Sequence, residues 1–564
     1  MILRYYKHIL LILTLSITPC TILHAQASFA EDLIIVGGGM AGAMEALFAY
    51  LDAKEKNLTI RIQIYDKIES ILETTVTRIV PSLTCDEILS VVPRGSELVH
   101  TLGILFSNPG GIRIDDVEGI HASDATEQFM REVELYSLDE AGHNERTQAL
   151  LRLGKMSMDL WQQLYDNADP ELKQILELSN FNPCCEIADN NRMLHKGYRI
   201  DLIYNVSNAR ERAESMQQAY ISLGYKNCAL LTPQEVIQLD PFLTEFCMQH
   251  STDNTWNTDA IALWRPGGCI DAQELLPQLY AYLTKMMGTY TDEDEQQKDC
   301  FQIHLGKKVT HLTFAHDTIT DTTTIIGLNF SDGQASINDN AHYVFCPGES
   351  VGTLKKLGLC EPAYAGFAGA SLMLTIDIPE DNIEDYATFS HCMEVHQEGV
   401  VLAWQARFKN NKIFIGVAGT KAFYSDQIPT KDQDFAKNRN LLQLNMINDV
   451  LPEFISLALG RDTHGELLAQ RDLDYLESQG IAMRWVGTRA VVFDGFPSLG
   501  FVYQDNGPKI KNGRCATHLG SGGASFSPAV TLICRQAMNK TVDSFAECIL
   551  AYGNSARVAK AVLI

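Results

Sequence analysis

Asp32-Leu33-Ile34-Ile35-Val36-Gly37-Gly38-Gly39-Met40-Ala41-Gly42 joins a short apolar run to glycines spaced G-x-G-x-x-G, and a helical pattern follows from Ala43 to about Ala53. In a strand–turn–helix, Gly37 permits the tight turn, Gly39 lets backbone N–H groups approach a pyrophosphate, and Gly42 lets the helix pack closely on the strand. Phosphates favour the amino end of a helix, where backbone donors have no partner within the helix. The stretch therefore predicts a dinucleotide-binding turn that includes all residues from Gly37 to Gly42.

A second alternating run, Thr59 to Tyr65, ends in Asp66. At this distance from the glycines, an acidic strand end is expected to bind ribose hydroxyls. A lone G-x-G-x-x-G is a weak signal, but its place between a strand and a helix, with Asp66 downstream, makes it strong. Lys67, next to Asp66, is a further candidate for the cofactor site.

The next segment, residues 73–81, is rich in hydroxyl side chains. Thr74 and Thr75 are candidates for hydrogen bonds to the phosphate or ribityl oxygens of a cofactor. The alternative is an ordinary loop with threonine turns.

The composition indicates a large folded protein. A chain of 564 residues is too long for one hydrophobic core, so we expect two or more lobes. Its 46% apolar and 20% charged residues fit a folded soluble protein rather than a disordered one. The formal net charge of −25 argues against nucleic acid or an anionic membrane as a partner, because both attract a basic surface.

None of the 14 cysteines lies in a CxxC or a His/Cys zinc spacing, and many lie in apolar runs. We expect mainly buried thiols rather than a disulfide framework, and we predict no metal site.

The N-terminus is typical of a secretory signal. Arg4 and Lys7 precede the apolar stretch 9–17, and Ala25-Gln26-Ala27 offers a small-x-small cleavage site. This pattern predicts an exported protein, periplasmic or secreted, with residues 1–27 removed. The many thiols are more usual in a reducing compartment. An uncleaved N-terminus that anchors the protein in a membrane is the alternative.

A mainly helical pattern runs from about Thr101 to Pro266, and a second βαβ-like zone then opens at Gly267-Gly268-x-x-Asp271. We expect a helix over 272–287, followed by strands near 308–313 and 324–330. Asp332-Gly333 is typical of a hairpin turn.

The apolar strand 342–346 runs into Pro347-Gly348, which is a possible place for phosphate or adenine contacts. Taken alone, such a turn is more often only a connection. The periodicity then changes to two between about Tyr364 and Ser425, which predicts an antiparallel sheet. A helical pattern over 434–457, with a break at Pro452, follows.

The order of these parts resembles the D-amino acid oxidase-like FAD oxidoreductases, a superfamily that includes glycine and sarcosine oxidases and D-amino acid dehydrogenases. The matching pieces cover most of the chain after Ala27. They are Gly37 to Gly42 with Asp66, Gly267-Gly268-x-x-Asp271, Pro347-Gly348, Trp485-x-Gly487-x-Arg489, Asp494-Gly495-x-Pro497-x-x-Gly500, and the glycine-rich turn from Gly520 to Ala524.

The resemblance implies an α/β fold with two lobes: a Rossmann-like FAD-binding domain assembled from discontinuous segments, and an α+β substrate domain with an antiparallel sheet. The expected segments are a signal peptide (1–27), FAD segment 1 (28–104), a mainly helical substrate or cap region (105–265), FAD segment 2 (266–352), the substrate-domain sheet and helix (353–482), FAD segment 3 (483–545) and a tail (546–564).

The resemblance also implies cofactor contacts near both ends of an FAD. The backbone of Val309 would pass the adenine. The turn Gly520-Ser521-Gly522-Gly523-Ala524 opens the last helix and would stabilise negative charge near flavin N1 and O2 with backbone N–H groups and the helix dipole, centred on Gly522.

The reaction expected from this resemblance is oxidation of a C–N bond in an amine or amino acid, with hydride transfer to flavin N5. Arg489 would clamp a substrate carboxylate, because a guanidinium forms a bidentate pair with it; a salt bridge between the lobes is its alternative role. The electron acceptor would be oxygen or a quinone. Two alternatives stay open: a flavoenzyme that oxidises a 2-hydroxyacid or another C–O substrate, and a non-catalytic exported flavin-binding protein.

Overall fold

A parallel sheet forms around the strand that precedes the glycine turn. In the computed structural model, β1 (Phe29–Val36) lies between β2 (Thr59–Tyr65) and β17 (Ala341–Phe345) and is parallel to both. β13 (Phe301–His304) extends the sheet beyond β2, and β24 (Lys509–Thr517) extends it beyond β17, again in parallel. Parallel neighbours need crossover connections, which explains why strands from three distant parts of the sequence meet here.

The structure describes the following residues: 29–73, 82–83, 113–114, 132, 140–179, 198–225, 228–291, 296–348, 353–362, 364–387, 389–397, 400–424, 434–492, 496–505, 507–517, 523–539 and 541–553.

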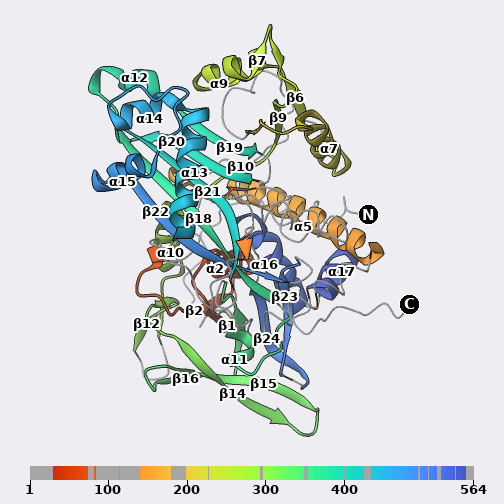
Figure 1. The fold of residues 1–564 in the computed structure, drawn as a ribbon. Helices are drawn as coiled ribbons and strands as arrows, with labels where there is room; N and C mark the ends of the chain where they lie inside the picture. The colour runs from red at the N-terminus through yellow and green to blue at the C-terminus, as the bar shows by residue number, and fades with distance from the viewer. Residues whose placement is uncertain are drawn as a thin grey trace, which may run out of the picture.

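Four helices pack together in one hydrophobic core with the parallel sheet. They are α2 (Met40–Glu55), α5 (Glu140–Asn167), α10 (Ala272–Met287) and α16 (Gly523–Asn539), and α2, α10 and α16 lie together at the centre of the view in Figure 1. The apolar side chains of β2 that belong to this core, such as Ile62, are fully buried.

An antiparallel layer completes this lobe. β14 (Val309–Asp317) and β15 (Thr322–Phe330) pair along their length, and β16 (Ala335–Ile337) returns along β15 (Figure 1). The predicted hairpin turn at Asp332-Gly333 joins β15 to β16, and Gly333 has φ +80°. β23 (Ser498–Tyr503) pairs antiparallel with β24.

A second sheet forms the other lobe. Its antiparallel part runs in the order β22 (Ala482–Val492), β18 (Tyr364–Asp377), β21 (Lys412–Tyr424), β20 (Val400–Lys409) and β19 (Ser390–Gln397). Apolar side chains on alternate positions of these strands share one core, which is the arrangement that the period of two predicts.

Three helices cover that apolar face: α13 (Asp434–Val450), α14 (Pro452–Leu459) and α15 (Gln470–Ser478). They lie along the sheet in Figure 1. The predicted break at Pro452 is confirmed, because this proline begins α14.

Three further strands extend the second sheet beyond β19. β5 (Tyr198–Ile203) pairs parallel with β19, and β9 (Ile261–Pro266) pairs antiparallel with β5 and with β6 (Ala229–Leu231). The shorter elements, given for reference, are η2 (Ile71–Glu73), β3 (Ser82–Leu83), β4 (Arg113–Ile114), α6 (Pro170–Leu178), α7 (Ala209–Ser222), α8 (Pro233–Leu239), η5 (Pro241–Leu243), α9 (Thr244–Gln249), β7 (Ser251–Thr252), β8 (Thr255–Trp256), β10 (Gly268–Cys269), β11 (Thr289–Thr291), β12 (Gln297–Asp299), α11 (Thr353–Lys356), η6 (Glu380–Asn382), α12 (Ile383–Tyr386) and α17 (Ser544–Tyr552).

The predicted fold class is confirmed: one lobe carries a parallel-rich sheet with helices, and the other carries an antiparallel sheet. The region 105–265, expected to be mainly helical, carries the helices α5 to α9 and also supplies β5, β6 and β9 to the second sheet. One segment differs from the expectation. β22 was expected in the FAD-binding lobe, but it pairs with β18 of the second sheet. No helix among the described residues is long and apolar enough to span a bilayer.

Candidate functional site

The turn after β1 leaves no room for side chains at two of its glycines. Gly37 has φ +113°, and a Cβ there would overlap the carbonyl oxygen of Cys346. A Cβ at Gly42 would overlap the carbonyl oxygen of Gly37. These overlaps give a steric reason for the first and third glycines of the motif.

The middle glycine differs, because the space around it is open. No heavy atom lies within 4 Å of a Cβ built on Gly39. Gly39 is the N-cap of α2, and no side chain caps this helix end. Met40 and Ala41 begin the helix, so their N–H groups lack acceptors within it. Open space next to uncapped donors is what a pyrophosphate requires, so these residues fit the cofactor predicted for them.

Asp66 lies against the same turn. Its Oδ2 accepts the N–H of Gly38, and its Oδ1 accepts the N–H of Ile68 at 3.1 Å. The backbone carbonyl of Asp66 accepts the N–H of Lys307 at 2.7 Å. The structure therefore brings together the glycine turn and the predicted acidic strand end. Lys67 follows with an exposed side chain.

Three further residues are predicted to contact the adenosine half of the cofactor, and each lies close in the chain to a residue that hydrogen-bonds to Asp66 or to the end of β1. Val309 begins β14, two positions after Lys307. Pro347 and Gly348 follow Cys346, whose N–H donates to the carbonyl of Val36 at 2.7 Å, so both turns lie at one edge of the parallel sheet. Gly348 is exposed and has φ +60°.

Tyr280 is a neighbour of the turn that the sequence did not point to. Its hydroxyl, on α10, donates to the carbonyl of Gly38 at 2.8 Å. Burial raises the pKa of Tyr280 well above its usual value, so the phenol remains a donor. Within a helix of repeated apolar residues, nothing distinguishes this tyrosine from an ordinary core residue.

The structure describes only part of the turn that is predicted to bind the flavin. Gly523 and Ala524 begin α16, and the indole Nε1 of Trp161 donates to the carbonyl of Ala524 at 3.0 Å. α16 packs against α2, so the two helices that would hold opposite ends of the cofactor share one core. The remaining predicted contacts lie outside the described residues: Thr74, Thr75, Gly520, Ser521 and Gly522.

Arg489 lies on β22, where its backbone is opposite Phe367 of β18. Trp485 and Gly487 lie two positions apart on β22 and therefore share one face of this strand. The indole ring of Trp485 covers Gly487, since a Cβ there would overlap the ring. The opposite face of the strand, with Arg484 paired to Glu477, lies against α15.

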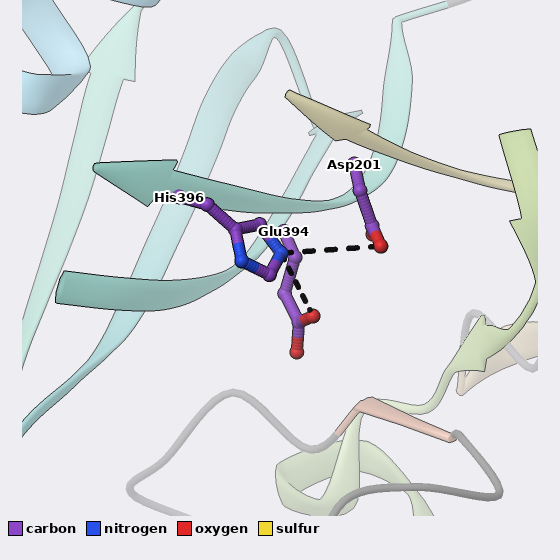
Figure 2. Close-up of side chains that lie close together, drawn as sticks. All are labelled: Asp201, Glu394 and His396. Carbon is purple, nitrogen blue, oxygen red and sulfur yellow. Dashed lines mark ion pairs between the residues drawn. The ribbon is translucent and has the colours of Figure 1, made fainter. Parts of the chain in front are cut away.

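A buried ion network lies on the second sheet, and the sequence analysis did not identify it. Asp201 on β5 and Glu394 on β19 each pair with both Arg199 and Arg265. Arg199 Nε lies 3.2 Å from Asp201 Oδ1, and Arg265 Nη2 lies 2.6 Å from Glu394 Oε2. His396 Nε2 lies 3.3 Å from Glu394 Oε2 and 3.9 Å from Asp201 Oδ2, as Figure 2 shows.

Asp201, Glu394 and His396 are close enough together to ligate a metal ion. Both carboxylates, however, are already neutralised by guanidinium groups, and Arg212 Nη2 lies 3.2 Å from His396 Nδ1. Burial and the positive charges of three arginines lower the pKa of His396 well below its usual value. A divalent cation would meet the same positive charges, so we interpret the cluster as a structural network that joins β5, β9 and β19.

Three solved structures illustrate what the chain is similar to. Glycine oxidase from Geobacillus kaustophilus superimposes with a TM-score of 0.52 at 14% identity, over 94% of this chain and 99% of that one. Glycine oxidase from Bacillus cereus gives 0.52 at 13%, over 95% and 100%. Fructosyl peptide oxidase from E. terrenum gives 0.52 at 14%, over 94% and 93%.

No protein-family model matches the sequence, and no curated protein matches it either. At identities this low, the likeness to the solved structures establishes the fold. The fold predicted from the motifs is therefore confirmed, since it is the fold of these oxidase structures.

Proposed function

We propose that this chain, which has the fold of the D-amino acid oxidase-like enzymes, is an FAD-dependent oxidoreductase acting on a C–N bond of an amine or amino acid. Similar structures carry the names glycine oxidase and fructosyl peptide oxidase, so enzymes named for amino acid and peptide substrates share the fold. Bound FAD would supply hydride acceptance at N5.

The observation that carries the proposal is the open cradle at the amino end of α2. Gly39 leaves free space there. Asp66, at the end of the adjacent strand, accepts the N–H of Gly38 with its carboxylate and so holds the turn in place. In this proposal Gly37 to Gly42 hold the diphosphate, Asp66 and Lys67 lie near the ribose, and Val309, Pro347 and Gly348 lie near the adenine. Thr74 and Thr75 complete the phosphate contacts.

At the flavin end, the proposal assigns backbone N–H donors to the turn 520–524. These donors, together with the amino end of α16, would stabilise negative charge on the flavin. Arg489 would orient a substrate carboxylate from β22, because a guanidinium matches a carboxylate with two parallel hydrogen bonds. The protein would act outside the cytoplasm, with oxygen or a quinone as electron acceptor.

The test begins with purification of the full chain. An absorbance band in the blue, and FAD released on denaturation, are expected. Anaerobic addition of D- or L-amino acids, N-methyl amines and 2-hydroxyacids should then bleach the band only with a nitrogen-bearing substrate.

Each other outcome points to a different conclusion. Bleaching by 2-hydroxyacids alone would replace C–N with C–O oxidation. A yellow protein that dithionite reduces, but no substrate does, would indicate a flavin-binding protein without this activity. A colourless protein with no affinity for FAD would refute the proposal.

A further inference from the structure

Two cysteines meet where the lobes join. Cys269 lies on β10, just before α10 of the lobe with the parallel sheet, and Cys392 lies on β19 of the second sheet. The thiol of Cys392 donates to the carbonyl of Gly268 at 3.1 Å, and the two thiols hydrogen-bond to each other. The side chains belong to residues only 2% and 7% exposed, so both sulfur atoms lie in the interior.

The strands on either side of this contact are held in place. β10 pairs antiparallel with β3, and the carboxylate of Asp271, two residues after Cys269, forms an ion pair with Arg407 on β20. Lys409 on β20 adds a second bond to α10, 2.6 Å from Glu274. The proximity of the two thiols is therefore imposed by several contacts between the lobes.

The surroundings favour formation of a thiolate within the pair. The hydrogen bond from Cys269 and the positive charges of Arg199 and Arg265 outweigh burial and lower the pKa of Cys392. A thiolate is the species that attacks a disulfide, and the contact between the two thiols places the second sulfur next to the first for the exchange that follows.

We propose that Cys269 and Cys392 form a disulfide bond that links the two lobes. The oxidant is a small-molecule disulfide, or the disulfide of an oxidoreductase, that the chain meets while it folds. One of the two cysteines, as its thiolate, attacks a sulfur atom of this disulfide and releases the other sulfur as a thiol. The second cysteine, on losing its proton, then attacks the mixed disulfide and releases the remaining half of the oxidant as a thiol. Two thiols of this chain lose two protons and two electrons, and the partner's disulfide is reduced to two thiols.

A second group of cysteines provides a control. The thiol of Cys534 donates to the backbone carbonyl of Cys515 at 3.3 Å and accepts the N–H of Gly500. Burial raises the pKa of Cys534 to about 12 and that of Cys346 well above its usual value. These thiols are equally buried, but the hydrogen bonds of Cys534 join it to backbone groups rather than to a second thiol, so we expect them to stay reduced.

The experiment is peptide mapping of the full chain, produced in the presence of oxidised glutathione and unfolded in an alkylating agent. Without reduction, the peptides that contain Cys269 and Cys392 should be found joined, about 2 Da lighter than their sum. Reduction should separate them, while Cys346, Cys515 and Cys534 carry alkyl groups from the start.

Thermal unfolding of variants adds a measurement of stability. The thermal midpoint of the oxidised wild type should fall by several degrees on reduction, because the link closes a long loop of the unfolded chain. Cys269→Ser should remove this response, and Cys534→Ser should retain it. The peptide map of the wild-type chain tests the proposed disulfide even where a variant fails to fold. Complete alkylation of both cysteines, or a bond from either one to a different cysteine, would overturn the proposal.

Discussion

At the scale of single residues, a substitution at Gly39 tests cofactor binding without disturbing the fold. Its φ of −77° is open to any residue, and a Cβ there meets nothing within 4 Å. Gly39→Ala should therefore leave the thermal midpoint of the FAD-free protein unchanged, while the methyl group obstructs the diphosphate. We expect a loss of FAD affinity of about tenfold or more, which is about 1.4 kcal/mol for each factor of ten. Fluorescence titration with FAD measures it.

Gly42→Ala is the matched comparison in the same motif. Its Cβ would overlap the carbonyl oxygen of Gly37, so the change should destabilise the FAD-free protein as well. Equal FAD affinity in Gly39→Ala and wild type would place the diphosphate elsewhere.

The buried network gives a second test at this scale. Asp201→Asn removes the carboxylate between Arg199 and Arg265 and leaves two guanidinium groups under-compensated in the interior. Removing one partner of a buried pair costs about 3–5 kcal/mol, and urea unfolding measures it. Glu214→Gln, in the exposed pair with Arg210 on α7, should cost less than about 0.5 kcal/mol. Similar losses for both variants would contradict the assigned role of the network.

At the scale of elements, Asp271 anchors α10 in two ways. Its Oδ1 accepts the N–H of Gln273 as a helix cap at 3.0 Å, and its Oδ2 pairs with Arg407 of the other lobe. Asp271→Asn keeps a capping oxygen but loses the ion pair, whereas Asp271→Ala loses both. We expect alanine to cost about 1 kcal/mol more than asparagine in the free energy of unfolding.

Asp543 gives the control for that comparison, because it caps α17 through the N–H of Ala546 at 2.8 Å. Asp543→Ala should cost about 1 kcal/mol, the effect of a cap. If asparagine and alanine at position 271 are equally damaging, the cap contributes nothing measurable and the ion pair alone anchors the helix.

How far the sequence predicts an element depends on whether its signals are local. The bounds of α10 were predicted correctly, because a capping aspartate precedes it and Gly288 follows it with φ +66°. α2 begins at Met40 rather than Ala43, since its first turn is formed by small and apolar residues that show no periodicity.

Sheet membership and long-range ion pairs are not local, and the predictions fail there. The alternation in β22 shows that it is a strand, but not that its partner is β18. The bonds from Arg265 to Asp201 and to Glu394 span 64 and 129 residues. Charged residues at alternate positions of an apolar run, as in Glu394-Val395-His396, were the available signal for this network.

At the scale of the whole molecule, buried histidines set the response to acid. Burial lowers the pKa of His250 and His304, and burial together with arginine charges lowers that of His396 well below 6.5. The unfolded chain binds protons near pH 6.5 that these folded-state imidazoles do not. These histidines therefore do not reduce the free energy of unfolding above about pH 6.5. As the pH falls below that value, each of them lowers it by up to about 1.4 kcal/mol per pH unit.

The exposed His464 has the opposite sign. A hydrogen bond to Asp462 and the nearby Glu245 raise its pKa, so it contributes stability below about pH 6.5 that is lost as the pH rises through its folded-state value. His396→Gln should therefore flatten the decline of the unfolding free energy between about pH 7.5 and about pH 5.5, and His464→Gln should steepen it. Urea unfolding across this range measures both slopes. The slope of the unfolding free energy against pH reports proton uptake rather than packing. If both variants change this slope in the same direction, His396 is not held neutral by its surroundings.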